Sequence, residues 1–419
     1  MVSQLASSDY ERNFVFSTPN GSIVPHILLF ILQMGALSAP VFPGRKVIFS
    51  TAIIGLAVAA SLNPFTTDPR LAQFFSLAWP HYLSVLEKII FAPHPGPEVT
   101  LWRIDRPAHE ALDFMPFGVR KFVWAFVIWF NLRGIRWNFQ VKNIPKGPSH
   151  RQGRWSFVVG RAIVFVRLLL IADLLCQLAV QNFYTASNGT VGTVNSRYLT
   201  TRHPNLLCRV YRTATVGMIP YTFMNLQYVG GAVFWVMLGI SKPVDWPPFF
   251  GRLSEVTTVR AFWGKFWHQM LRRTVNAYTG AFVDAVYLPP GTFRTYTQLW
   301  LSFMISGVMH AVSIYLIPAP LNIPFRERSL GFFQFFILQA AAITFEDFVQ
   351  YLYRNVAPGA KRSSWWHRLL GYGWTICWFA FSLPYFLDIM LKMKNMEKPM
   401  LPFTLLKPVV PYVSICARE

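Results

Sequence analysis

Long apolar runs separated by short polar segments dominate the chain. A helix needs about 20 mostly apolar residues to cross the hydrocarbon core of a bilayer. About eight runs come near that length: Ile23–Val41, Val47–Leu62, Leu71–Ala92, Phe157–Val180, Thr213–Ile240, Gln298–Ile317, Leu330–Leu352 and Trp366–Leu391. The pattern predicts an all-α, polytopic membrane protein with about eight (seven to nine) transmembrane helices.

One further apolar stretch, Phe117–Leu132, is short and carries Arg120 and Lys121 in its first turn. We expect an interfacial or re-entrant helix there. The first apolar run is expected to be a retained span, because the residues before it lack the design of a cleaved signal peptide. Residues 1–419 contain no internal repeat, low-complexity tract or long hydrophilic insert, and are therefore expected to form a single membrane domain.

The composition supports this fold class. Apolar residues make up 53% of the chain and charged residues only 14%, whereas about 25% of a soluble domain is charged. That excludes a soluble enzyme, a disordered chain and a coiled coil. The net charge of +21 comes from basic residues in the loops between apolar runs, which is the positive-inside distribution and does not predict a nucleic-acid partner.

The loop charges predict an orientation. Asn131–Trp155 carries six basic residues and no acid, which places it in the cytosol. The next loop is then lumenal, and it contains a glycosylation acceptor at Asn188. Residues 241–297 and 354–365 return to the cytosol. Four arginines in the lumenal loop oppose this orientation. The four cysteines lie far apart, so neither a disulfide framework nor a zinc site is predicted.

Two histidines stand out as candidate chemistry. His268 ends the segment Phe262–His268, in which Trp263 and Trp267 share one face if the segment is helical. Aromatic residues beside basic ones also suit an interfacial anchor, but an anchor does not need an imidazole. His310 lies inside an apolar span, where an ionisable group either faces a cavity with a task or is a neutral histidine bonded to Ser306 or a neighbouring helix.

Other intramembrane charges carry weaker signals. Arg161, Arg167 and Asp173 are expected to form structural pairs or to reach the interface, and Glu346 and Asp347 to help line a cavity. Several chemistries are excluded by missing motifs. The histidines never fall as HxxxH or HxxHH, no DDxxD-like pair exists, and neither a GxSxG elbow nor a Walker loop occurs. No metal site is predicted.

The segment Phe262–Gln269, followed by Ser306–His310, resembles the wax-synthase branch of the membrane-bound O-acyltransferases. Arg133–Phe139 is similar to an upstream signature of that branch, although Arg136 stands where the signature has Gly and Phe139 where it has Trp. These motifs bracket residues 131–317. The chain looks closest to fungal members, which acetylate terpenoid and mycotoxin alcohols.

The resemblance implies roles for particular residues. His310 is the expected catalytic residue and His268 its partner. The helices enclose a catalytic cavity, which acyl-CoA enters from the cytosol and a lipophilic alcohol from the bilayer. The expected substrate contacts are Trp263, Trp267, Ser306 and Gly307. The expected CoA contacts are Arg272, Arg273 and Arg136. Acetyl-CoA is a cosubstrate, and no bound cofactor is expected.

We therefore expect a multi-pass membrane O-acetyltransferase, in the endoplasmic reticulum, that moves acetyl from acetyl-CoA to a hydroxyl of a terpenoid or meroterpenoid metabolite. A neutral imidazole with an ordinary pKa near 6.5 is suited to take the alcohol proton. One alternative is a wax or sterol ester synthase that uses long-chain acyl-CoA. The other is a transporter or lipid-binding scaffold, since intramembrane His and Glu-Asp residues also mark transport pathways. The oligomeric state is not predicted.

Overall fold

The computed structural model describes residues 16, 18–185, 198–356, 365–397, 401, 403–406 and 416. Within them the regular elements are all helices, and isolated bridges pair Phe16 with Pro320 and Arg103 with Trp137. The all-α prediction is confirmed for these residues. The chain divides into two compact units, each described separately below. Unit 1 comprises Met1–Ser17, Ile144–His268 and Ala319–Glu419, and unit 2 comprises Thr18–Asn143 and Gln269–Pro318.

Unit 1 contains the three longest helices of the described residues, α7 (Arg154–Ala179), α8 (Leu206–Met237) and α12 (Phe325–Val356). Its other α-helices are the short α9 (Val259–Ala261), α13 (Trp365–Ser382) and α14 (Pro384–Lys392). The α7 and α8 helices pack along each other, and Phe157, Val236 and Trp246 belong to a buried cluster between them and the following loop. The Asn205 side chain begins α8 by accepting hydrogen bonds from the N–H groups of the first helical turn.

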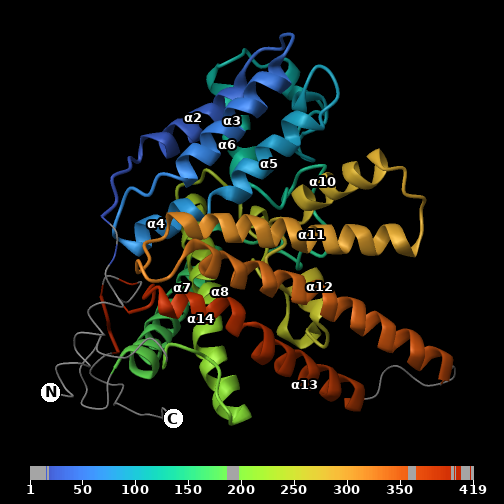
Figure 1. Cartoon of the computed structure of the whole chain (residues 1–419). Coiled ribbons are helices and arrows are strands. Elements are labelled where there is room, and N and C mark those ends of the chain that lie inside the picture. The colour runs from blue at the N-terminus through green and yellow to red at the C-terminus, as the bar shows by residue number, and fades with distance from the viewer. Residues whose placement is uncertain are drawn as a thin grey trace. The chain divides into compact units, whose positions relative to one another are not determined.

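Unit 2 is built from shorter helices. They are α2 (Val24–Ser38), α3 (Arg45–Ser61), α4 (Pro69–Ser76), α5 (Trp79–Ile90), α6 (Val119–Phe130), α10 (Arg272–Ala285) and α11 (Thr292–Ser313). Figure 1 shows α2, α3, α5 and α6 gathered side by side, and the contacts between them agree. Their core includes the fully buried Leu29, Leu37, Ile53 and Ile128.

Four helices in the described residues are long and apolar enough to cross a membrane: Arg154–Tyr184, Thr292–Leu316, Phe325–Val356 and Trp365–Lys392. They match four of the predicted spans. The predicted span Leu71–Ala92 is wrong as a single helix, because it divides into α4 and α5. Pro80 explains the break, since it lacks an N–H and its ring clashes with the carbonyl one turn earlier. The total of seven to nine spans stays a prediction.

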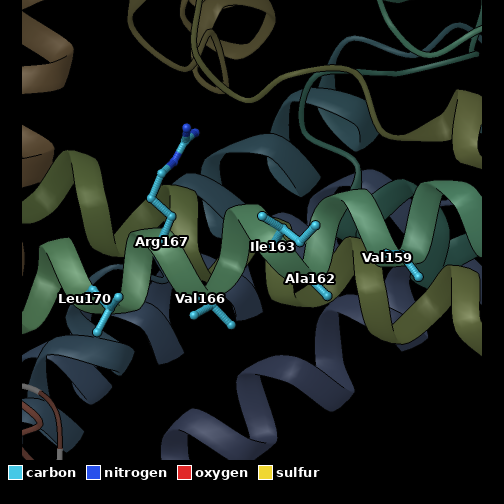
Figure 2. A pocket seen from close by; sticks show the side chains of 6 residues that line it. All are labelled: Val159, Ala162, Ile163, Val166, Arg167 and Leu170. Atoms are coloured by element: carbon cyan, nitrogen blue, oxygen red, sulfur yellow. The ribbon is translucent and has the colours of Figure 1, made fainter.

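The distribution of polarity is that of a membrane protein. Gln339 is 0% exposed and Asp173 1%, whereas the apolar Ile163 is 66% exposed. Along this outer face of α7 runs a groove of about 540 Å³, lined by Val159, Ala162, Ile163, Val166, Arg167 and Leu170. Figure 2 shows Val166 and Arg167 pointing to opposite sides of the helix. The groove contains none of the predicted site residues.

Two features correct the sequence analysis. Among the described residues, Asp173 is bound by backbone N–H groups and not by an arginine. One carboxylate oxygen accepts the N–H groups of Leu405 (2.7 Å) and Leu406 (2.9 Å). Cys208 and Cys416 form a disulfide with Cα atoms 5.8 Å apart, which a separation of 208 residues concealed. Two predicted features, the glycosylation acceptor Asn188 and most of the basic loop 354–365, lie outside the described residues.

Candidate functional site

The aromatic–histidine segment, residues Phe262–His268, is not a regular helix. The α9 helix ends at Ala261, a π-helical turn follows over Phe262–Phe266, and Trp267 is already extended. The backbone N–H of Trp267 donates a hydrogen bond to the Phe262 carbonyl at 2.8 Å. The expectation of a helix with both tryptophans on one face is therefore wrong in its geometry. Single π turns recur at functional sites, because they redirect the side chains that follow them.

His268 is half-buried among aromatic rings. Its ring centroid lies 5.4 Å from that of Trp267 and 6.0 Å from that of Phe249. The neighbouring Gly251 N–H donates to the Phe266 carbonyl at 2.8 Å. A Cβ on Gly251 would overlap the Lys265 carbonyl oxygen and lie 2.9 Å from the Phe266 Cα. This close approach packs residues 249–251 against the segment and fixes the backbone just before His268.

A polar residue that the sequence analysis did not single out connects this segment to α12. The Gln339 Oε1 accepts hydrogen bonds from the indole N–H groups of Trp263 (3.4 Å) and Trp378 (3.3 Å). Its Nε2 donates to the Ser382 hydroxyl at 3.2 Å. The sequence could have pointed to Gln339, because it is a glutamine within the apolar run Leu330–Leu352. Burying an amide costs free energy unless its polar atoms form hydrogen bonds. Trp263 is therefore held on α12.

His310 lies in the last turn of α11, three residues before its end at Ser313 and nearer the helix terminus than the apolar run suggested. The Ser313 hydroxyl donates to the His310 carbonyl at 2.7 Å. Ser306, the suggested partner of the imidazole, donates instead to the Ser302 carbonyl at 3.0 Å. Gly307 is buried one turn before His310. Residues three apart share a helix face, so Gly307 lies on the face of α11 that carries His310.

The arginines expected to contact CoA are held by internal partners in unit 2. Arg273 forms a 2.9 Å ion pair with Glu87, whose side chain is 4% exposed. The guanidinium also lies over the Phe139 ring of the upstream motif, 4.5 Å from its centroid. Arg272 donates to the Gln269 amide oxygen at 2.9 Å. The structure thus joins the upstream motif to the arginines that follow His268, an association the sequence did not reveal.

The upstream motif is itself a tight turn. Gly134 has φ of +63°, and a Cβ there would lie 2.5 Å from the Phe139 ring, so glycine is needed. Arg136 forms a 3.0 Å ion pair with Asp105. Hydrogen bonds from Arg103 and then Arg136 hold the pKa of Asp105 well below its ordinary value. Arg136 is therefore engaged with an acid at the surface of unit 2.

The predicted site residues divide between the two units. Unit 1 brings together Trp263, Trp267 and His268, and unit 2 brings together Ser306, Gly307 and His310 on one helix. Each imidazole is half-buried, and aromatic rings surround that of His268. In such surroundings hydrogen bonds to a bound molecule are electrostatically stronger than in water. Each group offers one imidazole able to exchange a proton or donate a hydrogen bond.

Two family models match the chain. Residues 246–337, which include both His268 and His310, match the membrane bound O-acyl transferase family. Residues 153–237, which cover α7 and α8, match the C-terminal domain of aspirochlorine biosynthesis protein F.

Curated fungal proteins are similar over longer stretches. Aspirochlorine biosynthesis protein F of Aspergillus oryzae is 43% identical over 58% of this chain and 94% of its own length. Acetyltransferase sirH of Emericella nidulans is 29% identical over 64% of this chain and 59% of its own length. O-Mevalon transferase yanI of Aspergillus niger is 27% identical over 85% of this chain and 82% of its own length.

These matches agree with the resemblance carried by the three motifs. They also agree with the apolar outer face and the long helices of the structure. The chain belongs to the membrane-bound O-acyltransferase family, as an acyltransferase similar to enzymes of fungal secondary metabolism.

Proposed function

We propose that this chain transfers acetyl from acetyl-CoA to a hydroxyl of a terpenoid or meroterpenoid secondary metabolite, with His310 as general base. The observation that carries the proposal is the place of His310, a half-buried imidazole on an apolar helix beside the buried Gly307. Its segment falls within the residues that match the O-acyltransferase family. The acetyl donor is favoured by the similarity to a named acetyltransferase.

The proposed reaction is a direct transfer. The neutral imidazole of His310 takes the hydroxyl proton as the alcohol oxygen bonds to the thioester carbon. The carbonyl oxygen becomes an oxyanion, for which His268 or a backbone N–H is the proposed hydrogen-bond donor. The carbon–sulfur bond then breaks, and the imidazolium returns its proton to the CoA thiolate. The products are the acetate ester and CoA, and no acyl-enzyme forms.

The other predicted site residues have binding roles in this proposal. Trp263 and Trp267 border the lipophilic acceptor, and Ser306 and Gly307 line its approach to His310. Arg272, Arg273 and Arg136 meet the CoA phosphates. In the structure Arg273 forms an ion pair with Glu87, and Arg136 forms one with Asp105.

An ester-forming assay tests the proposal. Membranes from cells that express the chain are incubated with labelled acetyl-CoA and a panel of terpenoid, sterol and fatty alcohols. We expect a labelled acetate ester, and we expect His310→Ala to reduce its formation by about 10²–10⁴-fold, the usual contribution of general-base catalysis. His367→Ala is the matched control, because this exposed histidine of α13 contacts Tyr353 and has no proposed role. Undiminished ester formation by His310→Ala refutes the proposal.

The same assay separates the alternative functions. Esters formed only with palmitoyl-CoA identify a long-chain wax or sterol ester synthase. Esters formed only with a mevalonyl donor place the chain with its O-mevalon transferase relative. No ester with any donor, together with proton- or ion-dependent flux, favours the transporter or lipid-binding scaffold.

The proposed location is the endoplasmic reticulum, with the loop around Asn188 in the lumen and Asn131–Trp155 in the cytosol. The Cys208–Cys416 disulfide supports this orientation, because Cys208 follows the proposed lumenal loop and disulfides persist in oxidising compartments. We expect endoglycosidase H to increase the electrophoretic mobility of the wild-type chain and to leave Asn188→Gln unchanged. Equal mobility of the two untreated chains contradicts glycosylation at Asn188.

A further inference from the structure

Glu346 occupies an unusual position in the middle of α12. It is 6% exposed and lies on a helix that qualifies as a membrane span. One carboxylate oxygen accepts the Val259 N–H at 2.6 Å and the Trp374 indole N–H at 2.7 Å. The other oxygen accepts the Arg260 N–H at 3.0 Å. Three N–H donors therefore converge on one buried side chain, which is what a buried carboxylate requires.

These contacts hold Val259 and Arg260, which lie just before the aromatic–histidine segment. The Thr258 hydroxyl accepts the next N–H, that of Ala261, at 2.9 Å. The N–H groups of residues 259–261 are thus all bound by side chains. The following acid on α12, Asp347, forms an ion pair with the Arg260 guanidinium nearer the surface. Glu346 therefore binds the backbone of residues 259 and 260, whereas Asp347 binds the side chain of Arg260.

Gln339 provides a second attachment on the same face of α12. It precedes Glu346 by seven residues, which is two helical turns, and so projects from the same side. Each of these two polar side chains accepts an indole N–H from α13, Trp374 at Glu346 and Trp378 at Gln339. Each also binds a residue in or just before the aromatic–histidine segment. Glu346 accepts the Val259 N–H, and Gln339 accepts the Trp263 indole N–H. The result is a ladder of two polar attachments.

A short stretch of backbone connects these two attachments to His268. The π turn begins at Phe262, directly after the residues bound by Glu346, and its Phe262 carbonyl accepts the Trp267 N–H. His268 is the next residue. A shift at residues 259–260 is therefore passed on through a single turn, and displacements of about 1 Å at a catalytic group lower rates by about 10²-fold.

We propose that Glu346 is a positioning residue for acyl transfer, which sets the place of His268 by binding the N–H groups of Val259 and Arg260. The inference rests on the proposed function for its effect on catalysis, and on the ladder alone for its effect on structure. Glu346 does not contact substrate in this proposal. Gln339 and Trp374 act with it.

Two readouts test the inference in purified full-length protein in nanodiscs. Glu346→Gln keeps the size of the side chain but replaces one acceptor oxygen with an NH₂ group that opposes the Arg260 N–H. We expect hydrogen exchange in a peptide over residues 259–267 to become about tenfold faster, as for a lost hydrogen bond to a charged group. Exchange in peptides from α7 and α11 should not change. Acetyl transfer should lose kcat by about tenfold or more, with little change in KM for acetyl-CoA.

Two further variants keep the test decisive. Glu346→Asp retains both acceptor oxygens, and we expect it to recover part of the lost protection and part of the lost kcat. Trp374→Phe removes one donor and leaves the carboxylate, so it addresses the ladder even if Glu346→Gln does not fold. Asp347→Asn is the matched control, because its ion pair with Arg260 is partly exposed and the backbone contacts remain. We expect wild-type exchange and rate from it.

The outcomes separate the two proposals. A wild-type protein without acyltransferase activity refutes the proposed function, while faster exchange confined to residues 259–267 in Glu346→Gln still supports the attachment. Unchanged exchange there overturns the inference. A general increase of exchange across all helices also overturns it, because it shows that Glu346 supports the fold as a whole. A fall in kcat with equal loss in Asp347→Asn overturns it as well.

Discussion

The two candidate histidines stand in opposite kinds of structure. His310 belongs to a regular helix of 22 residues, where its neighbours Gly307 and Ser306 follow from the helical repeat alone. His268 follows a π turn of five residues, and its place depends on side chains from α12, α13 and residues 249–251. The backbone of His310 follows local helical structure, and the backbone at His268 depends on tertiary contacts.

The difference suggests a division of labour. A base that abstracts a proton needs a ring in a fixed place, and a regular helix fixes the backbone that carries the ring. A hydrogen-bond donor aimed at an oxyanion must match a position defined by the substrate, and a segment held by separate attachments is adjustable by small changes in each. We therefore expect the two positions to tolerate different substitutions.

The largest expected effect on kcat comes from replacing His310 and His268, one at a time, with asparagine. An asparagine amide donates a hydrogen bond but does not take up a proton at neutral pH. His310→Asn should therefore lose about 10²–10⁴-fold in kcat, like His310→Ala. His268→Asn should stay within about tenfold of wild type, whereas His268→Ala should lose about 10²–10³-fold, the cost of one oxyanion donor. Steady-state kinetics of ester formation measures all four variants.

The comparison has a clear point of failure. If His310→Asn is active and His268→Asn is not, the two roles are exchanged. If both asparagine variants are active, neither imidazole is the base. Circular dichroism and size-exclusion profiles equal to wild type are required of each variant before its rate is interpreted.

The sequence was informative where local rules govern. The apolar runs at Phe157–Val180 and Leu330–Leu352 predicted α7 and α12 with ends a few residues short. His310 was found because an ionisable residue in an apolar run is unusual. The break at Pro80 was also readable, since proline interrupts a helix, but the apolar character of Leu71–Ala92 obscured it.

Contacts between distant residues were not predictable in the same way. Glu346 and Val259 are 87 residues apart, and Cys208 and Cys416 are 208 apart. No periodicity relates such positions, so the partner of a buried polar group has to be seen in the fold. The same holds for Glu87 and Arg273, which are 186 residues apart. The sequence identified Glu346 as costly to bury, and the structure showed the N–H groups that satisfy it.

A smaller effect is expected from two glycines near His268, and it tests whether the segment is held by close packing as well as by hydrogen bonds. A Cβ on Gly251 would overlap the Lys265 carbonyl oxygen, whereas a Cβ on Gly264 would meet no heavy atom within 4 Å. Gly251→Ala should therefore lower the free energy of unfolding by about 1–3 kcal/mol, the usual cost of overpacking. Gly264→Ala should change it by less than about 0.5 kcal/mol, as surface substitutions generally do.

Thermal unfolding in nanodiscs measures both variants under one set of conditions, so the matched pair cancels effects of the lipid. A stable Gly251→Ala with wild-type kcat shows that residues 249–251 do not constrain the segment. The attachment of His268 then depends on α12 and α13 alone. If Gly251→Ala is destabilised and also loses kcat while Gly264→Ala keeps its stability, the close approach at Gly251 acts as a third attachment. His268 would then be fixed from both ends of its π turn, whereas His310 lies within one regular helix.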